Sequence, residues 1–515
     1  MPADTTPLLP AQTLPRVTQI LSWPTAESLD NIEHLIVALP EHPDTTEWER
    51  IPGGPALRSL CGKRKQTGVL TTRLANSAHT GVSCKRLAGS ELQPAFARLS
   101  YAGQLAKAAL QDNPASVAVL VAGFDKAARE KLLHALVLGL YAHAFRLPEY
   151  RQTSSKALRL RSIRVIGLEQ RLDFGRTETE AAATNLARWL TALPPNKLSM
   201  KSYQSCLRQL ARDHDWGVTV HDTRKLAKLG AGAFLAVAQG NREDGACIVQ
   251  LRYRPPGGGS RTRPAVCLVG KGIVFDTGGT NLKPFKAMLD MHHDMAGSAV
   301  AVATLVALTQ LKVDFAVDCW VAITENRISG DAYKSRDIVT ACNGTTIEVI
   351  HTDAEGRMAL ADTLALAGRE APAALLDFAT LTGSCVAALT ERYSGAFCNR
   401  DSLHAAIVAA GRASGERVWT FPFDDDFDTE IKSQVADVLQ CAPAGGGDHI
   451  QAARFLKRFV PEDSAWVHVD LSAATRKGGL AHVPGEVTGF GVRFALNLLL
   501  DQQPTALQPQ EHQDT

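Results

Sequence analysis

Hydrophobic residues along this chain come in short runs that alternate with longer amphipathic stretches, which is the pattern of an α/β protein. In the first third, three apolar runs of strand length begin at Leu35, Ser116 and Ser162, and a helical stretch extends from Lys126 to Phe145. Because these strands alternate with a helix and not with tight turns alone, we predict an α/β domain of modest size.

The alternation becomes more regular after the segment RTETEAAATNLARWLTALPPNKLSM, whose helical pattern is ended by Pro194 and Pro195. The runs beyond it are strand-like at 246–252, 265–275, 315–323, 346–350 and 374–379, and helix-like at 298–311 and 358–369. The middle strands are apolar on both faces, as in a parallel sheet that is covered by helices. We therefore predict a larger C-terminal α/β domain with a mixed, largely parallel sheet covered by helices.

The length of 515 residues exceeds what one hydrophobic core normally supports, so two domains are expected. We place the junction near Phe174, which gives an N-terminal domain at 1–174 and a C-terminal domain at 175–505. Residues 506–515 have the composition of a polar tail. The segment PPGGGS at 255–260 predicts a loop between two strands, because its glycines and prolines exclude regular structure.

Charge and cysteine content argue against several classes of protein. Lysine plus arginine number 55 and aspartate plus glutamate 53, so the net charge of +2 gives no general reason to expect a nucleic-acid or membrane partner. The ten cysteines include no CxxC pair, which favours reduced thiols and a cytoplasmic location. The N-terminus lacks the pattern of a secretory signal, and no apolar run reaches the ~18 residues of a membrane span.

Charged residues gather where the predicted strands of the C-terminal domain end and helices begin. Two segments hold them: VGKGIVFDTGGTNLKPFKAMLDMHHDMAGSA with Lys271, Asp276, Lys283 and Asp294, and TDAEGR with Asp353, Glu355 and Arg357. Because side chains two apart on an extended segment point the same way, Asp353 and Glu355 are expected to present both carboxylates to one point. Four carboxylates at one sheet edge would be costly without cations, which predicts metal ions there.

Each of these charges has a simpler explanation when it is taken alone. Asp294 is placed like a first-turn acid of the helix that follows it, and Asp353 and Glu355 like first-turn acids of the next helix. His292 and His293 are also candidate ligands, although a helix start explains polar residues there equally well. The joint pattern, with each charge at a strand end or helix start in a glycine-rich run, favours the metal site.

The two charged segments resemble the signature blocks of the leucyl aminopeptidases, the cytosolic dimetal M17 family. There the blocks read close to GKGxxFDSGGxxLKP…M…DMxGAAAV and NTDAEGRLxLADAL, and here they read GKGIVFDTGGTNLKPFKAMLDMHHDMAGSAVAV and HTDAEGRMALADTLAL. The likeness covers roughly residues 170–500 and includes LPPNKLS, ITENRISGDAY, DIVTACNGTTIEV and ATLTGSCVAAL. It implies a macro-like N-terminal domain, a catalytic metallopeptidase domain and a homohexamer.

The resemblance also implies metal ligands for an aminopeptidase that binds two divalent ions. It makes Asp276 and Glu355 the carboxylates that bridge the two ions and Asp353 a ligand of the first. It makes Asp294 and the amine of Lys271 ligands of the second. A water between the ions would then lose a proton and become the nucleophile.

Further roles follow from the same resemblance. Lys283 would polarise the scissile carbonyl, and Arg357 would hold a bicarbonate anion that acts as general base. The positions that would line the substrate site are Met291, Thr380, Leu381 and Gly383. The implied reaction is removal of the N-terminal residue, with a leucine-like preference, from peptide substrates.

The identity of the metal has two interpretations. An oxygen shell with one amine and no His or Cys suggests Mg²⁺ or Mn²⁺, whereas the resemblance implies Zn²⁺ with Mn²⁺ or Mg²⁺ exchanging at one site. Lys271 can bind a metal only as a neutral amine. Lowering its pKa from about 10.4 to below 7 costs roughly 5 kcal/mol, which metal binding can supply.

Departures from the family pattern leave two alternatives to an ordinary peptidase. His351 stands where asparagine is usual, beside the substrate path, so we include it among the substrate-binding residues. The first alternative is a catalytically weak or inactive structural member of the family, against which the intact ligand set argues. The second is a peptidase with an added DNA-binding role, for which the basic cluster RSLCGKRKQT at 58–67 is the candidate patch.

Overall fold

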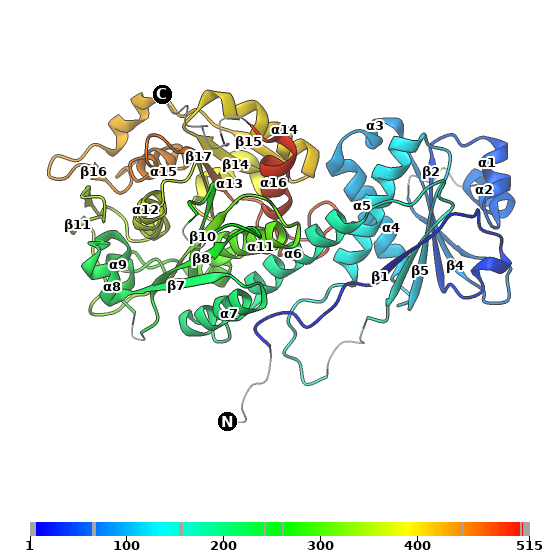
Figure 1. The fold of residues 1–515 in the computed structure, drawn as a ribbon, viewed down its shortest axis with the longest axis horizontal. Coiled ribbons are helices and arrows are strands. Elements are labelled where there is room, and N and C mark those ends of the chain that lie inside the picture. The colour runs from blue at the N-terminus through cyan, green and yellow to red at the C-terminus, as the bar shows by residue number, and fades with distance from the viewer. Residues whose placement is uncertain are drawn as a thin grey trace. The chain divides into compact units, whose positions relative to one another are not determined.

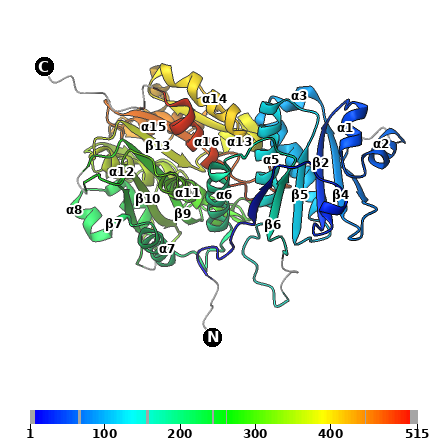
Figure 2. The same ribbon diagram turned by 45° about the vertical axis from the view of Figure 1, so that its right-hand side comes forward.

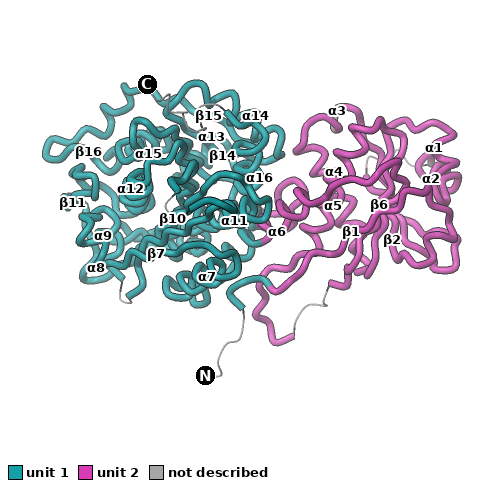
Figure 3. The backbone as a smooth tube through the Cα atoms, in the orientation of Figure 1, with its two compact units in different colours: residues 1–10, 186–476, 487–515 teal, residues 11–185, 477–486 magenta. Residues whose placement is uncertain are grey.

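The computed structural model describes residues 7–63, 68–153, 158–241, 244–259, 262–444, 446–504 and 507. The chain divides into two compact units, of which unit 1 comprises 1–10, 186–476 and 487–515, and unit 2 comprises 11–185 and 477–486 (Figure 3). This division falls inside helix α6 (Gly175–Ala192), and the junction near Phe174 stays a prediction. Apart from Leu507 the tail at 506–515 lies outside the described residues, as do residues 64–67 of the basic cluster.

Unit 2 is built on a six-stranded sheet in which five strands run parallel and the edge strand is antiparallel. In spatial order the strands are β1 (Arg16–Ile20), β6 (Ser162–Ile166), β5 (Ser116–Val121), β2 (His34–Pro40), β4 (Gly81–Leu87) and β3 (Leu70–Arg73). The helices of this unit before α6 are η1 (Glu27–Leu29), α1 (Thr45–Arg50), α2 (Gly54–Lys63), α3 (Gly89–Leu92), α4 (Ala95–Ala109) and α5 (Lys126–Ala144).

Strand β5 shows why the run SVAVLV becomes a central strand. Val117, Val119 and Val121 belong to the core cluster formed with α4 and α5. Ala118 and Leu120 belong to a second cluster that includes Trp48 of α1. Because strand side chains alternate between faces, a run that is apolar throughout can be satisfied only by a sheet that is covered on both sides.

Unit 1 is built on an eight-stranded mixed sheet (Figure 1). In spatial order the strands are β15 (Val418–Thr420), β14 (Ser394–Cys398), β17 (Ala465–Asp470), β13 (Ala374–Ala379), β9 (Val266–Asp276), β10 (Val317–Asn326), β8 (Cys247–Tyr253) and β7 (Gly217–Asp222). The four central strands β17, β13, β9 and β10 run parallel, whereas β14 and β8 are antiparallel to their central neighbours. The predicted mixed, largely parallel sheet is therefore confirmed.

The helices of unit 1 cover both faces of this sheet. After α6 they are α7 (Met200–Asp213), α8 (Thr223–Lys228), α9 (Gly232–Ala238), α10 (Phe285–Met288), η2 (Met291–Met295), α11 (Ala296–Gln310), α12 (Glu355–Gly368), α13 (Gly383–Leu389), η3 (Thr390–Arg392), η4 (Asp401–Leu403), α14 (His404–Ser414), η5 (Asp425–Ile431), α15 (Asp448–Lys457), α16 (Val492–Leu496) and the π-helix η6 (Asn497–Gln502). Among the described residues, none of the helices combines the length and the apolar character needed to cross a membrane.

Helices α11 and α12 pack on opposite faces of β9 (Figure 2). A Cβ atom at Gly270 would lie 2.4 Å from the Cα of Ser298 in α11, so only glycine allows this close approach. The next residue, Lys271, points to the other face, where it lies against Gly356 of α12. Strand β9 thus places the Lys271 amine between the sheet and the start of α12.

The strand predicted at 346–350 differs from the expectation. It forms β12 (Thr346–Glu348), which belongs to a separate three-stranded sheet with β11 (Ile338–Thr340) and β16 (Val438–Leu439). The prediction that this run belongs to the large parallel sheet is wrong. Ile347 and Val349 are fully buried, and burial alone gives a short strand the apolar pattern of a central one.

Candidate active site

Polar side chains end three of the parallel strands of unit 1 at one edge of its sheet. Strand β9 ends at Asp276, β10 at Asn326 and β17 at Asp470, while β13 is followed by Thr380 and Leu381. Loops from this edge line a cavity of about 550 Å³. The sequence-predicted residues that line it are Lys271, Asp276, Lys283, Met291, His293, Asp294, Asp353, Glu355, Thr380, Leu381 and Gly383. Arg357 and His351 are not among its lining residues.

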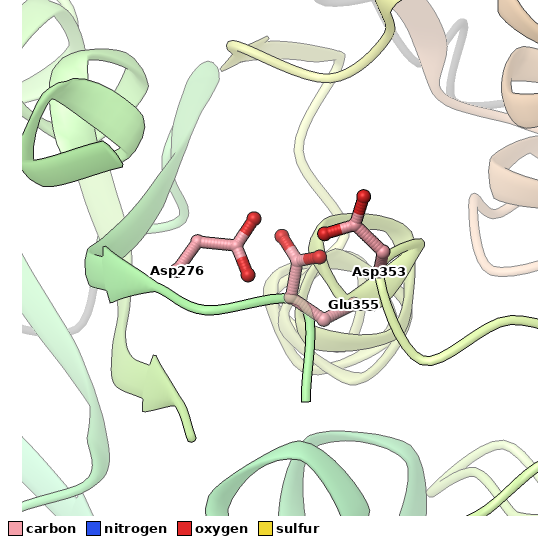
Figure 4. Close-up of side chains that lie close together, drawn as sticks. All are labelled: Asp276, Asp353 and Glu355. Atoms are coloured by element: carbon pink, nitrogen blue, oxygen red, sulfur yellow. The ribbon is translucent and has the colours of Figure 1, made fainter. Parts of the chain in front are cut away.

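Three carboxylates converge inside this cavity. Asp276, Asp353 and Glu355 each offer an oxygen, and these oxygens all lie within 4.8 Å of one another (Figure 4). The local structure is a helix start, since Glu355 is the first residue of α12 and Ala354 is its N-cap with φ −103° and ψ 36°. The two acids of TDAEGR therefore converge through a turn, and the expectation of an extended segment is wrong.

Two lysines lie between the carboxylates. The Nζ of Lys271 is 2.8 Å from Asp294 Oδ1 and 2.9 Å from Glu355 Oε1. The Nζ of Lys283 is 2.9 Å from Asp276 Oδ2 and 2.5 Å from Asp353 Oδ1. Burial alone would lower the pKa of both lysines, but the surrounding carboxylates outweigh it and raise the pKa of each. Both side chains are therefore ammonium groups when no metal is bound.

Three acids of the site, Glu355, Asp294 and Asp353, have raised pKa values because they are buried. Burial, followed by the charge of Asp276, raises the pKa of Glu355 to about 8. Burial raises the pKa of Asp294 to about 6 although the Lys271 ammonium opposes this. The pKa of Asp353 is raised by burial and by Asp276. Four carboxylates with two ammonium groups leave a site that favours further positive charge.

The donor set fits divalent metal ions. Within the described part of the chain, the buried oxygens Asp294 Oδ2 and Glu355 Oε2 accept no hydrogen bond. Buried carboxylate oxygens are normally satisfied, and oxygen donors are the ligands that hard cations take. The ammonium groups of Lys271 and Lys283 supply here the positive charge that metal ions would otherwise bring. Lys271 would have to lose its proton to become a ligand.

A glycine turn brings the β9 edge close to the other carboxylates. Gly278 and Gly279 have φ values of +86° and +66°, which favour glycine. A Cβ atom on Gly278 would lie 3.0 Å from Asp353 Oδ1, and one on Gly279 would lie 3.0 Å from Asn326 Oδ1. The Nδ2 of Asn326 donates to Asp276 Oδ1 at 2.8 Å and so orients that carboxylate.

Two residues with a structural part in this site were missed by the sequence reasoning. The first is Asn326, which orients Asp276. The second is Asp470, whose oxygens accept from the Leu381 amide at 3.1 Å and from Thr382 Oγ1 at 2.6 Å, which fixes the loop after β13. Both are the last residues of parallel strands. The strand predicted at 315–323 stops before Asn326, and the strand that ends at Asp470 was not predicted, so the strand-end rule that pointed to Asp276 did not reach either residue.

Arg357 and His351 lie beside the cluster and outside the cavity lining. Arg357 is buried, and its Nη2 donates to both carboxylate oxygens of Asp448 at 2.8 Å. His351 is exposed, and its Nδ1 accepts from the backbone N–H of Asp353 at 3.3 Å. The bicarbonate role of Arg357 and the substrate role of His351 stay predictions.

Comparison with known proteins decides the family. Residues 185–496 match the family described as "Cytosol aminopeptidase family, catalytic domain". The chain belongs to the cytosol aminopeptidase (M17) family. This confirms the resemblance found in the sequence, which was expected over roughly residues 170–500.

Relatives within the cytosol aminopeptidase family match at moderate identity. A probable cytosol aminopeptidase of Chlorobaculum tepidum is 41% identical over 321 residues, which cover 62% of this chain and 62% of the relative, less than two thirds of its length. One of Parasynechococcus marenigrum is 36% identical over 489 residues, which cover 92% of this chain and 97% of the relative.

Two solved structures share the fold of this chain. The bottromycin maturation enzyme BotP in complex with Mn has a TM-score of 0.79 and 30% identity, with 90% of this chain and 98% of that chain covered. A mutant of tomato leucine aminopeptidase has a TM-score of 0.80 and 26% identity, with 96% and 98% covered.

Proposed function

We propose that this protein is a dimetal aminopeptidase that removes the N-terminal residue from peptides. The observation that carries the proposal is the convergence of Asp276, Asp353 and Glu355 within 4.8 Å at the carboxyl edge of a parallel sheet, inside an open cavity. Such a buried acidic cluster is unstable by itself and becomes useful when cations bind it. Membership of the cytosol aminopeptidase family and the names of its relatives support the reaction class.

Five side chains would hold two divalent ions. Asp276 and Glu355 would be shared, Asp353 would bind one ion, and Asp294 with the amine of Lys271 would bind the other. Bound ions would supply Lewis acidity, which polarises the scissile carbonyl and lowers the pKa of a water. The manganese in BotP supports Mn²⁺ as one occupant, and Zn²⁺ and Mg²⁺ are the other candidates.

Lys283 acts on the substrate directly in this proposal. Its ammonium group lines the cavity, and in the metal-free protein the neighbouring carboxylates outweigh burial and raise its pKa. A fixed positive charge there stabilises the negative charge that develops on the carbonyl oxygen. Once metal ions take the carboxylates from it, the ammonium group of Lys283 is available to the substrate.

The cavity walls favour an apolar first residue. Met291, Leu381 and Val386 line the cavity, and Thr380 and Gly383 lie beside them. An apolar wall gains free energy from a leucine-like side chain of roughly 25 cal/mol for each Å² buried. We therefore propose a preference for bulky aliphatic N-terminal residues.

The test is hydrolysis of leucyl amides and short peptides with Mn²⁺ or Zn²⁺, before and after chelation. Release of the N-terminal residue should require metal, stop on chelation and return when metal is restored. No turnover with any divalent metal would reject the proposal, and so would undiminished turnover in the double variant Lys283→Ala with Asp353→Ala. Metal binding without turnover would favour a structural member of the family instead.

Family membership also supports a proposal about assembly and location. We propose a homohexamer in the cytoplasm, in keeping with the resemblance and with the name cytosol aminopeptidase carried by the relatives. The molar mass of the purified protein, measured by light scattering, should be six times that of the 55.3 kDa chain. A monomeric mass would contradict the proposal on assembly and leave the proposed reaction intact.

A further inference from the structure

Arg357 carries a buried positive charge whose partner comes from a distant part of the chain. It lies two residues after Glu355 on α12, and its side chain is only 2% exposed. Its Nη2 donates to both oxygens of Asp448 at 2.8 Å, and its Nη1 donates to the backbone carbonyl of Gln440 at 3.3 Å. Among the described residues, no acceptor reaches its buried Nε.

A buried guanidinium of this kind needs an anion. Burying a charge without a partner is costly, and a carboxylate that accepts two hydrogen bonds is a strong partner for arginine. The unpaired Nε is a further donor for which an acceptor would be favourable, because a buried donor without a partner costs roughly 1–3 kcal/mol. The surroundings of Arg357 therefore form an anion-binding site whose present occupant is Asp448.

The carboxylate of Asp448 is held in place by the start of helix α15. Asp448 is the first residue of this helix, where a negative charge is favoured. The backbone N–H of the next residue, His449, donates to Ser384 Oγ at 2.9 Å. Further along the helix, Arg454 binds Asp428 through Nε at 2.7 Å and through Nη2 at 3.0 Å. Both contacts fix the position from which Asp448 reaches Arg357.

We propose that Asp448 supplies, from within the chain, the oxyanion that the family resemblance places on Arg357 as free bicarbonate. This inference rests on the proposed peptidase function, because it concerns the anion of that same site. A carboxylate and bicarbonate offer the same pair of oxygens to a guanidinium, so they compete for the same N–H groups. The side chain of Asp448 is 39% exposed, and its removal would open Arg357 to anions from solution.

The first test compares wild-type protein with Asp448→Ala and the isosteric Asp448→Asn. The matched control is Asp112→Asn, which removes an exposed carboxylate that pairs with Arg73 in unit 2 and leaves Arg357 and helix α15 untouched. Hydrolysis of a leucyl amide by the manganese-loaded proteins is measured in buffer purged of carbon dioxide and again with added bicarbonate. Wild type and control should change less than about twofold, whereas Asp448→Ala should lose about tenfold or more and recover with bicarbonate.

The second test detects anion binding without turnover. Carbon-13-labelled bicarbonate is titrated with each zinc-loaded protein, because paramagnetic Mn²⁺ would itself broaden the signal, and binding is followed by magnetic resonance. Asp448→Ala should bind bicarbonate and wild type should not, while circular dichroism verifies that each variant is folded. Binding by wild type, or its absence in both Asp448→Ala and Asp448→Asn, would overturn the inference. If no protein hydrolyses the amide, the proposed function fails and the binding result still decides the role of Asp448.

Discussion

The two units of this chain are both built on a largely parallel sheet, but the residues at which the strands stop differ in polarity. In unit 2 the parallel strands end in apolar residues: β2 at Pro40, β5 at Val121 and β6 at Ile166. In unit 1 three of the four central parallel strands end in polar residues, β9 at Asp276, β10 at Asn326 and β17 at Asp470, whereas β13 ends at Ala379. Among the described residues, the carboxylate cluster suited to a metal ion lies in unit 1.

This difference indicates that residues needed for a reaction lower the stability of unit 1 at this edge. The core of unit 2 is apolar on both faces of its sheet, so its strands contribute mainly to folding. The edge in unit 1 buries Asp276, Asp294 and Glu355 together with Lys271, an arrangement that costs free energy unless all charges are matched. The carboxyl edge of a parallel sheet is a position where a functional site can form. In this chain the edge that carries charged residues is the one with the candidate metal site.

The largest effect is expected when a carboxylate is removed from the charged edge of the unit 1 sheet. Glu355→Ala should release bound metal and lower peptidase activity by more than the roughly 100-fold that loss of an outer-shell partner costs. Metal content is measured by atomic absorption and activity with a leucyl amide. The matched control is Glu41→Ala, which removes an exposed acid that follows Pro40 at the end of β2. Equal losses in both variants would mean that the charged edge has no special role.

A smaller effect is expected from crowding the same edge without changing its charge. A Cβ atom on Gly356 would lie 2.5 Å from Lys271 Cε and 2.7 Å from its Nζ. Gly356→Ala should therefore displace the Lys271 amine, which is the flexible end of its side chain, and weaken metal binding by about tenfold. Gly330→Ala serves as control, because nothing lies within 4 Å of the added atom there. Unchanged metal affinity in Gly356→Ala would show that Lys271 is no ligand.

Local patterns predicted the elements of both units well. The helix expected at 126–145 is α5 at Lys126–Ala144, and the strand expected at 374–379 is β13 at Ala374–Ala379. These elements follow from periodicity within the segment itself. The sheet to which a strand belongs depends on partners elsewhere in the chain, and for this reason the run at 346–350 was assigned to the wrong sheet.

The site shows the same division between local and distant information. Asp276, Asp353 and Glu355 were predictable because they lie in two short segments with a recognisable pattern. Arg357 and Asp448 are separated by 91 residues, and no pattern within either segment links the two. The sequence therefore predicted the three carboxylates that converge in the structure, and it did not predict Asp448 as the partner of Arg357.

In the metal-free protein, the stability of unit 1 should fall as the pH rises, whereas that of unit 2 should fall as the pH drops. The pKa of Glu355 is raised to about 8 and that of Asp294 to about 6, so the folded state holds their protons more tightly than the unfolded state does. Stability should be highest near pH 4 to 5 and fall as the pH rises to about 8. Lys271 and Lys283 stay charged throughout and do not change this sign.

Urea unfolding of chelated protein across this pH range measures the effect. Added Mn²⁺ should reduce the loss of stability at high pH, because metal binding favours the deprotonated carboxylates. The variant Glu355→Gln should show a flatter dependence than wild type, since it removes the group with the largest raised pKa. A stability that rises with pH in the chelated protein would contradict the picture of a proton-loaded cluster.

The stability of unit 2 should depend on pH in the opposite direction. This is the smallest of the four effects predicted here. His34 at the start of β2 is buried, and burial lowers its pKa to about 4, while its Nε2 lies 2.9 Å from Ser83 Oγ. Because the unfolded histidine has its usual pKa near 6.5, stability is lost as the pH falls through that value toward about 4. The cost is on the order of 1 kcal/mol at pH 5.5.

Hydrogen exchange within β2 and β4, compared between wild type and His34→Gln at each pH, isolates this effect from the pH dependence of exchange chemistry. Wild type should lose protection relative to the variant on going from pH 7 to about pH 5.5, whereas β9 should show no such difference. Equal pH dependence of β2 in the two proteins would mean that His34 is protonated in the folded state. The sheet of unit 2 would then hold a buried charge, as the sheet edge of unit 1 does, and the two units would differ only in how many charges they bury.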